Sequence, residues 1–253
     1  MVGSFLNVIV YRVPLQRSII APPSACMQCG TRINVYDNIP IFSWLLLRGK
    51  CRNCKSAISM RYPFVELGTG VLFGIVAWKF WPASVSGFLL LIAFLYLAAA
   101  SVALALIDLD THTLPNAIVI PSYFVGAALL CAAGIANGNY GALFRASIGM
   151  AVLWIFYFAT AMAYPGGMGF GDVKLAGVLG LYLGYLSWGA LVTGAFAAFI
   201  LGGIFGSALL ASRKVSRKSG IPFGPWMLVG AWVGVLFSAP IVHSYFSLFG
   251  FQK

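Results

Sequence analysis

Long apolar runs separated by short polar connections dominate the pattern of hydrophobic and polar positions along this chain. A membrane-spanning helix needs about 20 mostly apolar residues. Seven runs approach that length, after a shorter one at the start; they cover residues 1–13, 64–81, 87–108, 116–136, 142–164, 172–187, 189–212 and 225–248. The runs are continuous rather than alternating, which favours helices over the strands of a membrane barrel. The pattern therefore predicts an all-α polytopic membrane protein with about eight transmembrane helices.

Composition supports this interpretation, because 61% of the residues are hydrophobic and only 8% are charged. A soluble domain carries about 25% charged residues, so the chain is not an ordinary soluble domain. The first run is too short to cross a bilayer unaided; either residues are missing upstream or the assigned start trims the true one. A cleaved signal peptide is disfavoured, because the run lacks a basic flank and a small-residue cleavage site.

The net charge of +11 is explained by where the basic residues lie. Loops rich in Lys and Arg stay cytoplasmic. Eleven basic residues fall in two loops, after the first run and before the last: Arg17, Arg32, Arg48, Lys50, Arg52, Lys55 and Arg61, then Arg213, Lys214, Arg217 and Lys218. On the opposite side lie Lys79, Arg145 and Lys253. We therefore expect an outward N-terminus, cytosolic basic loops, membrane lipid as a partner and no nucleic acid.

Residues 14–63 form the one sizeable polar region, between the end of a first helix (1–13) and a helical bundle (64–253). This region holds two Cys-x-x-Cys pairs, Cys26 with Cys29 and Cys51 with Cys54. Such pairs suit a tetrahedral four-thiolate zinc site, which leaves no open position and so points to a structural role. The alternative is free or disulfide-paired thiols, although disulfides are disfavoured in the cytosol. Cys131, within a later run, is expected to be a small buried hydrophobe.

Two of the five acidic residues, Asp108 and Asp172, stand at the ends of apolar runs. Carboxylates at membrane depth are costly and usually functional. Counting crossings places both at the cytoplasmic rim. A pair of carboxylates that share one proton can hydrolyse a peptide bond. The ionised one activates water, and the protonated one donates its proton to the carbonyl oxygen. The sequence therefore predicts a catalytic pair, on condition that the third and sixth of the eight runs, 87–108 and 172–187, are neighbours.

Asp110 competes with Asp108 for the first position. Two residues apart on a helix means about 200° of rotation, so both cannot face one site, and periodicity alone leaves the choice open. The segment 165–171 is rich in glycine and is expected to be non-helical. A simple alternative for Asp172 is therefore an aspartate that caps the helix after a glycine-rich turn.

Three further polar residues have ordinary structural explanations beside functional ones. Lys174 does not share the helical face of Asp172 and is expected to snorkel to the interface. Glu66 falls one turn into its run, where the helix dipole favours an acid, and a functional role is equally open. His112 is expected to be a loop residue.

In order along the chain, these residues resemble the bacterial type IV prepilin peptidases, also called prepilin leader peptidases/N-methyltransferases. The resemblance covers nearly the whole sequence. It rests on Gly3–Val8 with Tyr11–Pro14, the four cysteines, Asn38–Pro40, Ser43–Trp44, Arg61–Pro63, Val65–Leu67, Ile107–Asp108 with Leu114–Pro115, Gly169–Leu175 and Ile221–Pro225.

The family pattern places the first acid seven residues before the proline, which selects Asp108 over Asp110. Its glycine-x-glycine-aspartate motif makes Asp172 the second acid, and we count Gly169, Gly171, Lys174 and Glu66 as supporting residues. The chain departs from the family in two places. Its first helix looks truncated, and Asn116 stands where the family often has aspartate.

The resemblance implies an aspartic endopeptidase of the bacterial inner membrane, with its site toward the cytoplasm. Its substrates would be prepilins or pseudopilins, cut between a basic leader and an apolar helix. The resemblance also implies N-methylation of the new N-terminus with S-adenosylmethionine, although no methyl-donor site is recognisable. Retention of all four cysteines fits the bifunctional branch. Two other classes stay open, a transporter with proton-carrying acids and a zinc-ribbon membrane scaffold.

Overall fold

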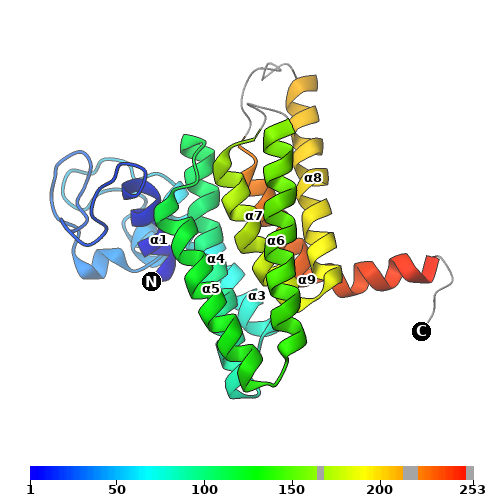
Figure 1. Cartoon of the computed structure of the whole chain (residues 1–253). Helices are drawn as coiled ribbons and strands as arrows, with labels where there is room; N and C mark the ends of the chain where they lie inside the picture. The colour runs from blue at the N-terminus through cyan, green and yellow to red at the C-terminus, as the bar shows by residue number, and fades with distance from the viewer. Residues whose placement is uncertain (164–167, 213–221, 249–253) are drawn as a thin grey trace.

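A computed structural model describes residues 1–163, 168–212 and 222–248, and within these it is helical with no β-strand. The prediction of an all-α protein is confirmed. Apart from a 3₁₀ turn, Val35–Asn38, the elements are α1 (Val2–Arg12), α2 (Phe42–Leu46), α3 (Arg61–Lys79), α4 (Val85–Thr111), α5 (Asn116–Ala136), α6 (Tyr140–Ala163), α7 (Phe170–Leu186), α8 (Trp188–Ala211) and α9 (Gly224–Leu248). Figure 1 shows the long helices side by side, with α1 and the cysteine-containing loop on one flank.

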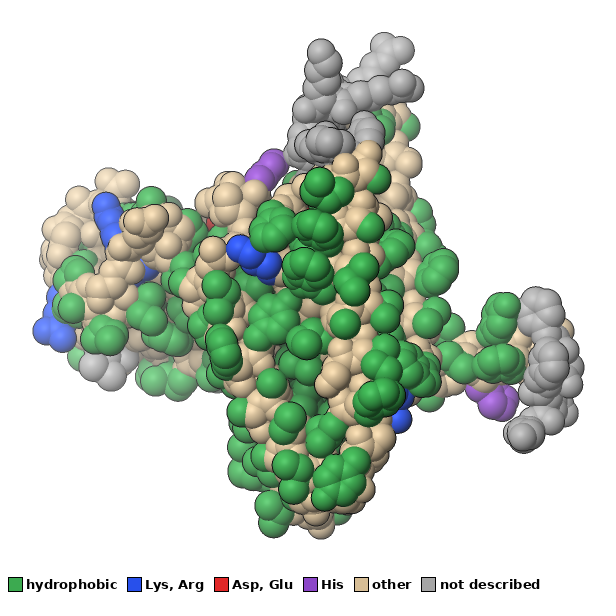
Figure 2. All heavy atoms as spheres, in the orientation of Figure 1, with side chains coloured by type: hydrophobic (Ala, Val, Ile, Leu, Met, Phe, Trp, Pro, Cys, Tyr) green, Lys and Arg blue, Asp and Glu red, His purple; other side chains and the backbone are tan. Residues whose placement is uncertain are grey.

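Five of the described helices, α4, α5, α6, α8 and α9, are long and apolar enough to cross a membrane. Helix α7 has 17 residues and α1 has 11, so both are short for a crossing. Helices occur where all eight apolar runs predicted them, but eight crossings are not confirmed. In Figure 2, hydrophobic side chains cover the visible flank of the bundle, as expected for a surface that faces lipid.

Helix α7 lies at the centre of the bundle, and every residue from Asp172 to Tyr185 except Lys174 is buried. It packs against α5, α6, α8 and α9. A helix that is apolar all round belongs in such an interior position. Helix α4 reaches α7 through the rings of Phe94 and Tyr182, whose centroids are 5.4 Å apart in an edge-to-face contact. The third and sixth of the eight apolar runs, which form α4 and α7, are therefore neighbours.

Small residues bring two helix pairs into backbone contact. Between α6 and α7, a Cβ added to Gly149 would lie 2.6 Å from the carbonyl oxygen of Gly180. Between α8 and α9, a Cβ on Gly230 would lie 2.7 Å from the Cα of Ala198. Glycines four residues apart permit this close approach in membrane helices, where packing replaces the hydrophobic effect.

The C-terminal end of α7 is capped from a distance by Arg145, in the second turn of α6. Its guanidinium donates to the carbonyl oxygens of Gly184, Tyr185 and Leu186, at 3.2, 2.9 and 3.3 Å. The last carbonyls of a helix have no partner within the helix, and a cation at this end also suits the helix dipole.

Replacing Arg145 with glutamine should therefore destabilise the bundle by about 2 kcal/mol, the scale for hydrogen bonds to a charged group. That loss corresponds to a fall in Tm of roughly 4–8 °C for a chain of this size. Thermal unfolding in detergent micelles measures it. Lys79→Gln is the matched control, because Lys79 is exposed at the end of α3. Equal melting of the Arg145 variant and wild type would contradict the capping role.

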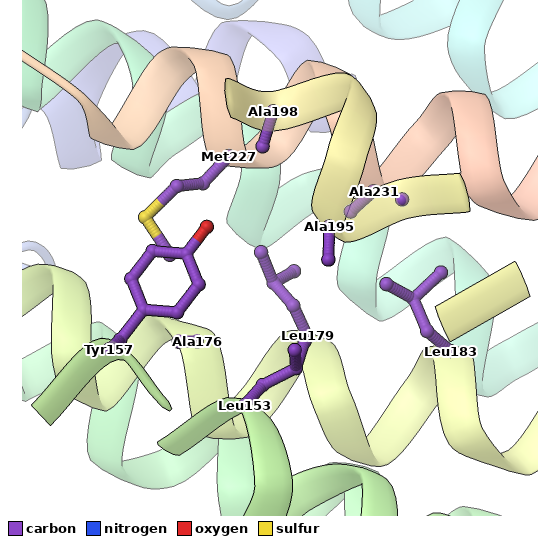
Figure 3. A pocket seen from close by; sticks show the side chains of 10 residues that line it. Leu153, Tyr157, Ala176, Leu179, Leu183, Ala195, Ala198, Met227 and Ala231 are labelled. Atoms are coloured by element: carbon purple, nitrogen blue, oxygen red, sulfur yellow. The ribbon is translucent and has the colours of Figure 1, made fainter. Parts of the chain in front are cut away.

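The core between α6, α7, α8 and α9 contains a small cavity, shown in Figure 3 with side chains such as Leu153, Leu179 and Met227 around it. Its volume is about 10 Å³, roughly the space of one water molecule. The cavity is too small for an organic ligand.

One prediction about the core is wrong. Cys131 is exposed on α5 rather than buried. An apolar residue of a membrane bundle can face either lipid or protein, and an apolar run does not distinguish the two environments.

Candidate active site

Asp108 lies in the last turn of α4, and its side chain is buried, with 4% exposed. Its Oδ2 accepts a hydrogen bond from the backbone N–H of Gly224, the first residue of α9, at 3.0 Å. A Cβ on Gly224 would lie 2.7 Å from the same oxygen, so the close approach requires glycine. The carboxylate of Asp108 is thus held by the start of a helix far along the chain.

Asp172 lies in the first turn of α7 and is 8% exposed. Its Oδ2 accepts the backbone N–H of Gly169, the N-cap residue, at 3.0 Å. Asp172 therefore does cap its helix. Residues 164–167 lie outside the described residues, but Phe170 and Gly171 belong to α7, so the prediction of non-helical backbone through Gly171 is wrong at these two positions.

The two buried carboxylates lie at the same end of the bundle, and Leu114 lies close to a glycine beside each of them. A Cβ on Gly171 would lie 3.0 Å from the Cβ of Leu114, and one on Gly224 would lie 3.3 Å from its Cδ2. Leu114 thus touches the start of α7 and the start of α9 together. Asp108 and Asp172 are close enough to act on each other electrostatically. In the described part of the chain, neither forms an ion pair.

Asp110 points away from this site, as the helical rotation between it and Asp108 predicts. Its carboxylate pairs with Arg61, with Nη1 to Oδ1 at 2.9 Å and Nη2 to Oδ2 at 2.5 Å. The pair fastens the start of α3 to the end of α4. Asp110 is therefore not the partner of Asp172 in this structure.

Lys174 faces α5, away from the carboxylates. Its ammonium donates to Oδ1 of Asn116 at 3.0 Å and lies 5.0 Å from the ring centroid of Phe170. The neutral Asn116 thus gives Lys174 a hydrogen bond where an aspartate would give an ion pair. Lys174 therefore contacts α5 rather than either of the two carboxylates.

Glu66 has a local structural task. Helix α3 begins at Arg61, so Glu66 lies in the second turn and the first turn has no acid; the helix-dipole explanation is wrong. Its Oε2 accepts the backbone N–H of Ile41 at 2.8 Å, and a Cβ added to Gly3 would lie only 2.7 Å from the Cα of Glu66. Glu66 joins α3 to the cysteine loop. His112 ends α4 with a left-handed backbone, φ 53°.

The four cysteines come together in two similar turns. In the first, the N–H of Cys26 donates to the carbonyl of Thr31, and in the second the N–H of Cys51 donates to that of Ser56. Gly30 and Lys55, each directly after the second cysteine of its pair, both have positive φ, 68° and 60°.

The thiols of Cys26, Cys29, Cys51 and Cys54 fit a tetrahedral metal centre. All four Sγ atoms lie within 4.8 Å of one another, and Cys26 and Cys54 are 3.8 Å apart. Zinc–sulfur bonds of about 2.3 Å give a tetrahedron edge of about 3.8 Å. Hydrogen bonds from the backbone N–H groups of Cys29 and Gln28, and then the Ser56 hydroxyl, lower the pKa of the Cys26 thiol to about 6. The cluster could therefore hold a metal ion.

Two family profiles match the chain. The profile described as the bacterial peptidase A24 N-terminal domain matches residues 1–80, and that of the type IV leader peptidase family matches residues 95–207. The chain belongs to the type IV leader peptidase family. The first profile covers the cysteine loop of this leader peptidase, and the second covers both Asp108 and Asp172. The resemblance inferred from the motifs is confirmed.

Relatives of this leader peptidase span its full length. A prepilin leader peptidase/N-methyltransferase of Pseudomonas putida is 36% identical and aligns with 99% of this chain and 92% of its own. Proteins with the same name are 34% identical in Stutzerimonas stutzeri, over 97% of this chain and 90% of their own, and 34% in Neisseria gonorrhoeae, over 92% and 86%. No solved structure matches the chain.

Two residues at the rim of this leader peptidase were missed as functional candidates. Gly224 appeared only as part of a family stretch, and its N–H is the partner of Asp108. Leu114 appeared only beside its proline, and it is the contact between the two aspartate-bearing regions. The only sequence feature that could have indicated these two residues is the spacing of small and apolar residues around the acids. That spacing can be interpreted only when the packing of the helices is known.

Proposed function

We propose that this leader peptidase cleaves type IV prepilins or pseudopilins between a basic leader and an apolar helix, at the cytoplasmic face of the inner membrane. One observation carries the proposal. The two buried carboxylates that lack an ion pair in the described residues, Asp108 and Asp172, share one end of the bundle. The relatives' names support the substrate class, and the Lys/Arg-rich loop supports the orientation.

The proposed chemistry uses the chain's own carboxylates. One of Asp108 and Asp172 is ionised and removes a proton from water, which attacks the scissile carbonyl carbon. The other is protonated and donates to the carbonyl oxygen, so that one proton is shared between them. The backbone N–H groups of Gly169 and Gly224 fix one oxygen of each carboxylate and leave the other oxygen for water and peptide. No covalent intermediate is required.

We also propose N-methylation of the new N-terminus, with S-adenosylmethionine supplying the methyl group. This part rests on the relatives' names. Among residues 1–163, 168–212 and 222–248, no set of side chains identifies the methyl-donor site, and no step of the transfer is assigned to a residue.

Mass spectrometry of a co-expressed prepilin tests both activities together. We expect a mature pilin that lacks its leader and carries one additional methyl group at its N-terminus. Cells without this protein provide the control. Unprocessed prepilin would contradict the peptidase, and cleaved but unmethylated pilin would contradict only the transferase.

The four-cysteine cluster is proposed to hold structural zinc. Purified protein should contain about one zinc per chain by elemental analysis, and Cys26→Ser should remove most of it, because three thiolates hold the ion less well. The matched control is Cys131→Ser, since Cys131 is exposed on α5. Equal zinc contents of the two variants would contradict the site.

A further inference from the structure

The short helix α2, within the cysteine loop, has an exposed apolar face. The side chains of Phe42, Leu45 and Leu46 are 67%, 58% and 83% exposed. Three large apolar side chains that lie together on one short helix require an explanation, since such patches mark interaction sites.

This face is held rigidly, because the opposite face of α2 is tied into the loop. Ser43 is buried, and its hydroxyl donates to the carbonyl oxygen of Tyr36 at 2.9 Å. The indole N–H of Trp44 donates to the carbonyl oxygen of Ile58 at 3.2 Å, and its ring covers Gly49. The loop is therefore built to present Phe42, Leu45 and Leu46 outward.

The position of α2 relative to the bundle is fixed by its N-cap residue. Ile41 has φ 64° and ψ −52°, a strained turn for a β-branched residue, and its N–H is bound by Glu66. Glu66 lies five residues into α3 from Arg61, which is about 7.5 Å along a helix. Arg61 and Asp110 form an ion pair between the start of α3 and the end of α4. Since Glu66 lies further along α3, α2 begins closer to the middle of the bundle than this ion pair.

At this depth along α3, large apolar side chains next to Glu66 are exposed. Phe64 and Leu67, on either side of Glu66 in the sequence of α3, are 63% and 52% exposed, so α3 also presents apolar side chains at this depth. In Figure 1, the light-blue α2 lies level with the long helices rather than beyond their ends. Interfacial helices lie about 5–10 Å into the boundary between headgroups and acyl chains.

The charge beside α2 is complementary to anionic lipid. Residues 14–60 contain six Lys or Arg and a single acid, Asp37, which is already paired with Arg52 at 2.6 Å. Arg48 and Lys50 follow α2 directly and are exposed. Basic residues next to a membrane surface are attracted to anionic headgroups.

We propose that α2 is an interfacial anchor that holds the cysteine loop on the membrane. Phe42, Leu45 and Leu46 enter the acyl-chain boundary, and Arg48 and Lys50 bind anionic headgroups. The anchor fixes the loop against the same bilayer that α3 enters. It does not depend on the peptidase activity.

Fluorescence quenching in the full-length protein tests this anchor. A fluorescent amino acid replaces Leu46 by codon reassignment, and the protein is reconstituted in vesicles of phosphatidylethanolamine and phosphatidylglycerol. Nitroxide-labelled acyl chains should quench position 46 at least threefold more than the same probe at Met27, which is exposed on the same loop. Aqueous iodide should show the reverse order. Equal access of iodide to both positions would overturn the anchor.

The second arm tests the headgroup contact. Arg48→Gln with Lys50→Gln should at least halve the lipid quenching at position 46 in anionic vesicles. The same pair should have no effect in phosphatidylcholine vesicles. Unchanged quenching in anionic vesicles would overturn the role of the two cations. If position 46 is shielded from both lipid and aqueous quenchers, a protein surface covers α2 and the lipid proposal is wrong.

Discussion

Replacing Asp172 with asparagine is expected to slow prepilin cleavage by a factor on the order of 10³ or more, and Asp108→Asn is expected to do the same. An amide can neither take a proton from water nor donate one as a carboxylic acid does. Its oxygen can still accept the N–H of Gly169 or Gly224, so the local fold is retained. The time course of prepilin cleavage by the purified, reconstituted variants measures the effect.

The matched control is Asp110→Asn, the same chemical change two residues away on the same helix. Asp110 is 39% exposed and paired with Arg61, and an exposed pair contributes about 0–1 kcal/mol, so this variant should keep most of the activity. Cleavage at the wild-type rate by either Asp108→Asn or Asp172→Asn would refute the catalytic pair. Equal loss in all three variants would indicate a structural effect instead.

Gly149→Val should have the largest effect on stability. A Cβ at this position would lie 2.6 Å from the carbonyl oxygen of Gly180 and 3.0 Å from the Cα of Gly184. Both neighbours are backbone atoms, so α6 must move away from α7, the helix that carries Asp172. We expect a loss of about 3 kcal/mol or more, which lowers Tm by roughly 6–12 °C.

The control for this substitution is Gly203→Val. Gly203 is also within a long apolar helix, α8, but an added Cβ there meets nothing within 4 Å. Its Tm should change little, since valine is no worse than glycine in a helix. Size-exclusion profiles of the two variants after heating in detergent give the comparison. Similar melting of both would show that the α6–α7 contact is less tight than the structure indicates.

The positions of the helices could be predicted because each is an apolar run bounded by polar residues. The predicted run 116–136 coincides with α5, Asn116–Ala136. Helix α3 begins at Arg61 rather than at residue 64, because a polar first turn that is fastened to Asp110 does not appear in an apolar pattern. The number of crossings was not predictable to the same degree, since a buried 17-residue helix such as α7 has the same composition as a crossing one.

The candidate site could be predicted only in part. Spacing excluded an Asp108–Asp110 pair, because helical rotation is a local property. The donor to Asp108 was not predictable, since the N–H of Gly224 reaches this carboxylate only through tertiary packing. For the same reason, the hydrogen bond that Glu66 accepts from Ile41 was not predictable. It also requires Ile41 to adopt a backbone conformation that is rare for its residue type.

The hydrogen bond between Asp108 and Gly224 joins positions 116 residues apart, with Asp172 between them. The ribosome therefore synthesises both aspartates before it reaches Gly224, whose N–H orients Asp108. A chain halted after α8 has both acids but not this donor. The observed arrangement around Asp108 is therefore complete only once α9 has entered the bundle.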